Sequence, residues 1–311
     1  MERQRLKTGK FGLGTMIHSV HMTDDVSQLN RFYEEVFGGL LFMGVDEPNY
    51  LPVEDRYAGL VLISDLCIET MAPKMPADPT KPVGKFYTKF GRHLHSVGYK
   101  ADDLPGLGND LIAKGVYIGA PGGGRIEKMD DQTIYFYPSP RDTCGLMVEL
   151  CGMEMPGDPR LLANWSSHVK QWELVHPLGI RRLGWVTLGV RDLDDAVARY
   201  VELFEAERLH AGTDENEGAR FEILHLGDAL LRLAQPLEPS TPLGQHVAKW
   251  GNMIYGITLV VRDLDAVQGW LGRHSVGTSR LNSEVVAADP ADTFGAPYFF
   301  TTTTFAGDPF A

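Results

Sequence analysis

The sequence predicts an α+β protein, a tandem pair of similar domains, each made of two βαβββ modules that form a curved mixed sheet. The main observation is an internal repeat. The run PVGKFYTKFG at residues 82–91, which leads into HLHSVGYKADDL, recurs without a gap as PLGQHVAKWG at 242–251, which leads into MIYGITLVVRDL. IHSVHM and GWVTLGV are likewise both followed by an amphipathic helix pattern, and DLCIETMAP matches DALLRLAQP. The same order of elements therefore occurs twice.

The first half contains a shorter repeat of its own. A helix is predicted at 26–37, because apolar residues recur there at helical spacing (Leu29, Phe32, Tyr33, Val36 and Phe37). Alternating apolar residues bounded by glycine and proline predict the strands. The first module has strands at 15–22, 40–45, 58–63 and 66–71. The second has strands at 94–100, 116–120, 133–137 and 146–151, with a helix at 105–114. We expect one domain at 12–152, a linker with a helix at 153–179, and a second domain at 180–311.

Composition and charge narrow the possible partners. The 311 residues carry a net charge of −12, and the basic residues form no stripe that could neutralise nucleic-acid phosphates. No apolar run is long enough to span a membrane. Cys67, Cys144 and Cys151 have no zinc-ribbon or redox spacing, so reduced thiols are expected. These features indicate a cytoplasmic monomer or homodimer that acts on a small-molecule substrate and binds neither nucleic acid nor membrane.

Four possible metal ligands occupy matched places in four strand-like segments of the first half: His18, Glu69, His95 and Glu149. Imidazoles and carboxylates suit a divalent cation. If each strand directs one polar side chain into an apolar cup, the two carboxylates need a cation to neutralise them. Taken singly, each His could be an ordinary core or surface residue, and Glu69 could end a strand in solvent. As a set, the four predict a divalent metal ion (Zn, Ni, Co, Mn or Fe).

Paired βαβββ modules with these ligands resemble the vicinal oxygen chelate superfamily, which includes glyoxalase I, methylmalonyl-CoA epimerases, extradiol dioxygenases and antibiotic-resistance binding proteins. The runs PVGKFYTKFGRHLHSVGYKADDL, APGGGRI and IYFYPSPRDTCGLMVELCG are locally most similar to the epimerases. The resemblance implies a metal-dependent isomerase or lyase of glyoxalase or epimerase type. Such an enzyme forms a metal-stabilised enolate from a small carbonyl or thioester substrate.

The resemblance also implies roles for individual residues. Glu149, as a displaceable ligand, or Glu54 is the expected catalytic base, with Asp55 as an alternative to Glu54. Substrate contacts are expected from three residues near the cup, namely His93, Tyr99 and Tyr137, the first two because they share strand parity with His95. Two other functions stay open. One is an Fe(II) ring-cleaving dioxygenase with two His and one carboxylate, and the other is a non-catalytic protein that binds a small molecule.

The second half departs from the ligand pattern. Trp185 replaces His18, Arg232 replaces Glu69 and Tyr255 replaces His95, and we expect the chain to end before any counterpart of Glu149. None of these replacements is an ordinary ligand for a divalent metal. The second domain should therefore bind no metal. Its role would be to pack against the first domain, or to form an accessory pocket for an anionic or aromatic ligand.

Overall fold

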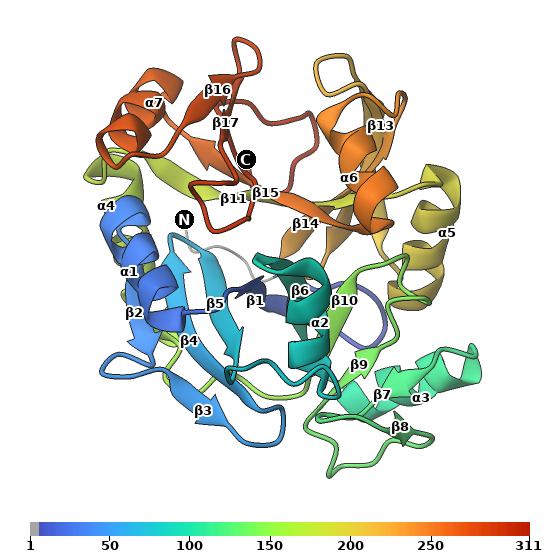
Figure 1. The fold of residues 1–311 in the computed structure, drawn as a ribbon. Coiled ribbons are helices and arrows are strands. Elements are labelled where there is room, and N and C mark those ends of the chain that lie inside the picture. Colours follow the sequence, from blue (N-terminus) through green and yellow to red (C-terminus); the bar gives the residue numbers. More distant parts are fainter. Residues whose placement is uncertain (1–5) are drawn as a thin grey trace.

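Two mixed β-sheets, one from each half of the chain, form the framework of the protein in a computed structural model that describes residues 6–311. The first sheet lies in the lower half of Figure 1, in blue to green, and the second in the upper half, in yellow to red. Helices from both halves pack around the two sheets. This is the α+β tandem architecture that the internal repeat predicts.

The first sheet has the strand order β2-β4-β5-β1-β6-β10-β9-β7-β8, with β3 paired to β4. Its four central strands, β5, β1, β6 and β10, are those that carry the four predicted ligands. The strands are β1 (Leu13–Met22), β2 (Leu40–Met43), β3 (Asn49–Leu51), β4 (Arg56–Ile63), β5 (Leu66–Pro73), β6 (His93–Ala101), β7 (Ile118–Gly119), β8 (Arg125–Ile126), β9 (Tyr135–Pro138) and β10 (Met147–Cys151).

The helices of the first half are α1 (Val26–Phe37), α2 (Pro82–Phe90) and α3 (Leu104–Ala113). Helix α1 begins where the Asp25 carboxylate accepts a hydrogen bond from the Gln28 backbone N–H, and it ends at Gly38, whose φ of 63° suits glycine. Asp103 caps α3 in the same way. Aspartate therefore begins the helix that follows the first strand of each module.

The linker contains a 3-10 turn, η1 (Pro159–Leu161), and helix α4 (Trp165–Leu174). The partly buried Arg160 of η1 donates hydrogen bonds to the backbone oxygens of Met16 and Ile17 and pairs with Asp158. Trp172 donates from its indole to the Phe37 oxygen. These contacts attach the linker to the first domain.

The second sheet repeats the order of the first, as β12-β13-β14-β11-β15-β18-β17-β16. Its strands are β11 (Ile180–Gly189), β12 (Glu207–Asp214), β13 (Ala219–Leu226), β14 (Ala229–Pro236), β15 (Met253–Val261), β16 (Thr278–Arg280), β17 (Val285–Ala288) and β18 (Tyr298–Thr301). Its helices are α5 (Leu193–Phe204), α6 (Pro242–Trp250) and α7 (Leu264–Arg273). No helix within residues 6–311 is long and apolar enough to cross a membrane.

The two halves meet through contacts that occur twice. The Met16 backbone N–H donates to Asp228 Oδ1 at 2.6 Å, and the Leu183 N–H donates to Asp65 Oδ1 at 2.6 Å. Sheet registers make Met16 and Leu183 equivalent, and likewise Asp65 and Asp228. The interface is therefore pseudo-symmetric, which is expected when a duplicated domain packs against its copy.

Candidate active site

The four predicted ligands lie on the adjacent strands β5, β1, β6 and β10. Glu69 pairs with Val20 of β1, while His18 and Glu149 both pair with Gly98 of β6, from opposite sides. A Cβ at Gly98 would lie 2.7 Å from His18 Nε2. Glycine at this position therefore leaves the room that the imidazole fills.

His18 is the centre of the group. Its side chain is buried, and its Nε2 lies 3.5 Å from Glu69 Oε2 and 3.9 Å from Glu149 Oε2. Neither ring nitrogen has a hydrogen-bond partner in the described part of the chain. A buried imidazole nitrogen without a partner is costly, and Nε2, which lies near both carboxylates, is the nitrogen that could bind a cation.

His95 comes close to this group through a bulge in β6. Val20 pairs with Ser96 and His21 with Leu94, so His95 is the extra residue. Strict alternation from Gly98 would place His95 on the opposite face from His18, and a bulge re-aims a side chain in this way. Burial lowers the pKa of His95 to about 3, with smaller effects from charges that include Glu69 and His18. This lowered pKa favours the neutral ring, and because its Nδ1 lies 2.8 Å from Ser96 Oγ, its Nε2 is available to act as a ligand.

Arg56, which sequence reasoning missed, occupies the carboxylate side of the cup. The buried guanidinium donates to Glu69 Oε1 and to Glu54 Oε2. Burial alone would raise the pKa of Glu69, but Arg56 and His18 outweigh it and hold that pKa below its usual range. The sequence feature that could have revealed this role is an arginine in the otherwise apolar strand RYAGLVLI, two residues after Glu54.

Tyr137 joins two carboxylates of the group. Its hydroxyl donates to Glu149 Oε2 at 2.9 Å and lies 3.3 Å from Glu54 Oε1. Burial raises the pKa of Glu149 above its usual range, against the opposing effects of His18 and this hydrogen bond. Burial and the two carboxylates also raise the pKa of Tyr137, so the phenol stays protonated.

The charges of this group fit a divalent cation. Glu54, Glu69 and Glu149 supply three negative charges and Arg56 one positive charge, which leaves two negative charges among largely buried groups. As they stand, no three His, Cys, Asp or Glu side chains of residues 6–311 are placed to hold a metal ion. The donor set and the partnerless His18 nonetheless suit one, and side-chain adjustment would bring the donors together.

The structure places the other predicted residues differently. Asp55 hydrogen-bonds Tyr50 at the surface, so Glu54 and not Asp55 faces the group. Tyr99 is only 1% exposed and lies in the hydrophobic core beside Gly227 of the second domain, so the expected substrate contact was wrong. The bulge at His95 is the physical reason, because it ends the shared parity. His93 lies at the domain interface, with its ring 5.7 Å from that of His246.

The second sheet carries a counterpart of each ligand position. Trp185 pairs with Thr258 as His18 pairs with Gly98, and Arg232 pairs with Thr187 as Glu69 pairs with Val20. Phe299 pairs with Thr258 as Glu149 pairs with Gly98. The expectation that the chain ends before a counterpart of Glu149 was therefore wrong. The sequence hid this position because phenylalanine shares no chemistry with glutamate.

Comparisons with known proteins agree with the tandem architecture. No family model and no curated protein matches this chain. A solved structure of a triple mutant of 4-hydroxymandelate synthase from Streptomyces coelicolor is 12% identical, with a TM-score of 0.61, over 97% of this chain and 95% of that chain. The chain thus shares the overall fold of that structure along almost its whole length, across both of its domains.

Smaller structures match part of the chain. Methylmalonyl-CoA epimerase from Mycobacterium tuberculosis is 23% identical, with a TM-score of 0.36, over 39% of this chain and 87% of that chain. A variant of the Streptomyces coelicolor epimerase is 22% identical, with a TM-score of 0.38, over 42% of this chain and 99% of that chain.

Proposed function

We propose that the first domain is a divalent-metal-dependent isomerase or lyase that removes a proton next to the carbonyl of a small carbonyl or thioester substrate. The observation that carries the proposal is His18, whose two buried nitrogens have no partner in residues 6–311 while two carboxylates flank the ring. His18, His95, Glu69 and Glu149 would hold the cation. When bound, it would supply Lewis-acid stabilisation of the negative charge that develops on a substrate oxygen.

Glu54 is the proton acceptor in this proposal. It lies beside the donor set without being needed in it, and it forms a buried ion pair with Arg56. Tyr137 contacts both Glu54 and Glu149, so its hydroxyl orients the two carboxylates toward the same space. Glu69 is held by Arg56 through Oε1, which leaves Oε2 directed at His18.

Proton exchange tests this chemistry directly. The Zn²⁺-loaded protein should exchange the α-proton of an acyl-CoA ester or a 2-oxoaldehyde adduct with deuterated solvent, measured by NMR. Glu54→Gln should abolish exchange and keep the metal, because glutamine cannot accept the proton. The His95→Ala variant should lose both proton exchange and the bound metal. The absence of exchange with both substrate classes would contradict the proposal.

One observation favours a second function. Arg56 binds Glu69 through Oε1, and His18, His95 and Glu149 by themselves form the two-His-one-carboxylate set of Fe(II) oxygenases. In that alternative the protein loaded with Fe(II) cleaves a dihydroxylated ring. Oxygen uptake with catechol, measured with an oxygen electrode, would support it, and uptake no greater than that of the His18→Ala variant would exclude it.

A further inference from the structure

The second domain contains a cavity of about 500 Å³ at the place where the first domain has its candidate metal ligands. We propose that this cavity binds a small organic cation, an ammonium compound with an aromatic or alkyl body. The inference is independent of the chemistry proposed for the first domain. A cavity of this size is in the range that small-molecule ligands occupy.

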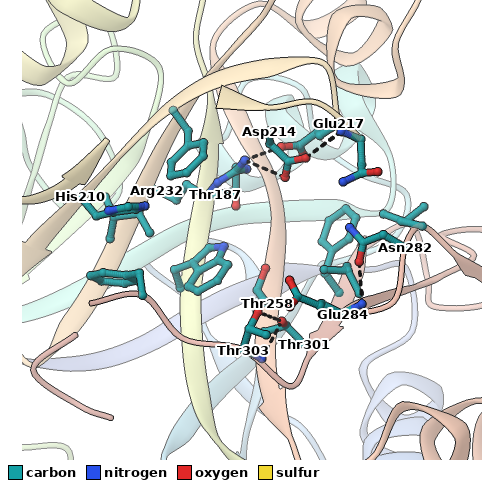
Figure 2. Close-up of a pocket in the computed structure, with 18 of the residues that line it drawn as sticks. Thr187, His210, Asp214, Glu217, Arg232, Thr258, Asn282, Glu284, Thr301 and Thr303 are labelled. Atoms are coloured by element: carbon teal, nitrogen blue, oxygen red, sulfur yellow. Dashed lines mark hydrogen bonds and ion pairs between the residues drawn. The ribbon is translucent and has the colours of Figure 1, made fainter. Parts of the chain in front are cut away.

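Aromatic side chains form the walls of the cavity. Trp185 and Phe299, which stand where the first domain has His18 and Glu149, both line it, together with Phe221 and Phe305. Figure 2 shows aromatic rings among the side chains that line the cavity, together with the hydroxyl-bearing Thr187 and Thr258. Aromatic faces are negative at their centres and attract ammonium groups.

The charge of the lining favours a cation. Four carboxylates line the cavity, and Arg232 is the one basic side chain among these lining residues apart from His210. The carboxylates are Asp214, Glu215, Glu217 and Glu284. The lining thus has an excess of negative charge beside low-dielectric aromatic walls, which strengthens attraction for a positive ligand.

Arg232 does not supply a free site for an anion. Its Nη2 lies 2.6 Å from Glu217 Oε2 and 3.7 Å from Asp214 Oδ2, and Figure 2 shows it directed at both carboxylates. The guanidinium also lies 4.6 Å from the centre of the Phe221 ring. An anionic ligand, which the sequence left open, would compete with these carboxylates. Tyr255 does not line the cavity and packs instead against Phe299 and His246.

The C-terminal segment completes the cavity. Thr303, Thr304 and Phe305 line it, and the Phe305 ring stacks on His210 with 5.2 Å between centres. The buried Asp308 pairs with Arg182 of β11 and anchors this segment to the sheet.

Isothermal titration of the full chain with benzyltrimethylammonium, benzyl alcohol and phenylacetate tests the proposal. Benzyltrimethylammonium should bind saturably, and more tightly than the neutral and anionic compounds. Trp185→Leu should weaken its binding by about fivefold or more, as expected for the loss of a desolvated cation–π contact. Glu284→Gln should weaken it by about threefold, through the loss of one charge at the cavity.

Glu284 is exposed, so Glu284→Gln should fold normally even if Trp185→Leu does not, and thermal unfolding checks both. Glu238→Gln, an equivalent change of an exposed carboxylate outside the cavity lining, is the matched control and should bind like the parent chain. The proposal is overturned by the absence of saturable binding of benzyltrimethylammonium, by equal binding of phenylacetate, or by parent-like affinity in Glu284→Gln.

Discussion

The two domains share a strand order and a register, yet the charged residues of their cups stand at different positions. In the first, the carboxylate of Glu69 lies on β5 and the guanidinium of Arg56 on β4. In the second, Arg232 occupies the Glu69 position on β14, and Ala219 the Arg56 position. Glu217 stands where Glu54 stands and pairs with Arg232.

This difference shows that two copies of a domain can keep the same fold while the residues of their cups differ. Each cup retains one buried guanidinium paired with a carboxylate, so neither leaves an isolated buried charge. The first cup has candidate metal ligands, and Gly98 leaves space there for the His18 ring. The second has aromatic rings at the His18 and Glu149 positions and an open cavity.

The largest expected effect comes from removing the arginine of each cup. Arg56→Met leaves Glu54 and Glu69 buried without their cation, so the metal-free protein should lose about 3–5 kcal/mol of unfolding free energy. Arg232→Met should cost less, because its partners Glu217 and Asp214 are more exposed. Urea unfolding in EDTA measures both. Added Zn²⁺ should restore part of the loss in Arg56→Met only, and equal costs for the two variants would contradict the comparison.

The next effect concerns pH and a histidine that only the first domain has. His21 lies 2.6 Å from the Tyr33 hydroxyl and 3.0 Å from the Phe294 oxygen of the second domain, and its counterpart is Leu188. Burial lowers the pKa of His21 to about 4. The unfolded chain therefore takes up this proton first, so the stabilisation is present above pH 6.5 and is lost as the pH falls toward 4.

At its full extent this loss amounts to about 3 kcal/mol of unfolding free energy. Unfolding by urea between pH 7.5 and 4.5 should show it, and His21→Leu, which copies the second domain, should have a shallower pH dependence. Partly buried His176 and His246, whose pKa values burial also lowers to about 4, and His95, whose pKa it lowers to about 3, remain in both proteins and contribute to the background slope. Identical slopes would exclude a role for His21.

Swapping the residues that pair with His18 and Trp185, namely Gly98 and Thr258, tests the comparison further. Gly98→Thr, which copies Thr258, should displace the His18 ring and weaken metal binding by about 10- to 100-fold, as loss of ligand positioning does. Thr258→Gly is the matched reverse change and should leave metal binding unaltered. Competition with a chromophoric chelator gives both affinities. Unchanged affinity in Gly98→Thr would mean that His18 is not a ligand.

The smallest effect is expected from the Tyr137 hydroxyl, whose counterpart in the second domain is Ala287. Tyr137→Phe removes the hydrogen bonds to Glu149 and Glu54 and should cost about 1 kcal/mol of unfolding free energy. Tyr135→Phe is the control, because no hydrogen bond of its hydroxyl occurs within residues 6–311. Chemical unfolding of the two variants provides the test, and a larger cost for Tyr135→Phe would contradict it.

Much of the fold could be predicted because apolar periodicity and the internal repeat act over short distances in the sequence. Three of the proposed ligands gather for the same reason, since His18, Glu69 and Glu149 each lie within a regular strand. The bulge at His95 could not be predicted, because it depends on pairing between strands, and it removed Tyr99 from the site. Arg56 was missed because its contact with Glu69 depends on the pairing of two strands, β4 and β5.

Metal content of the purified protein tests the central claim most directly. After reconstitution with Zn²⁺ and removal of excess, elemental analysis should find one ion per chain, none in His18→Ala, and one in Trp185→Leu, which alters only the second cup. A stoichiometry below one tenth in the parent chain, or one ion retained in His18→Ala, would contradict the account.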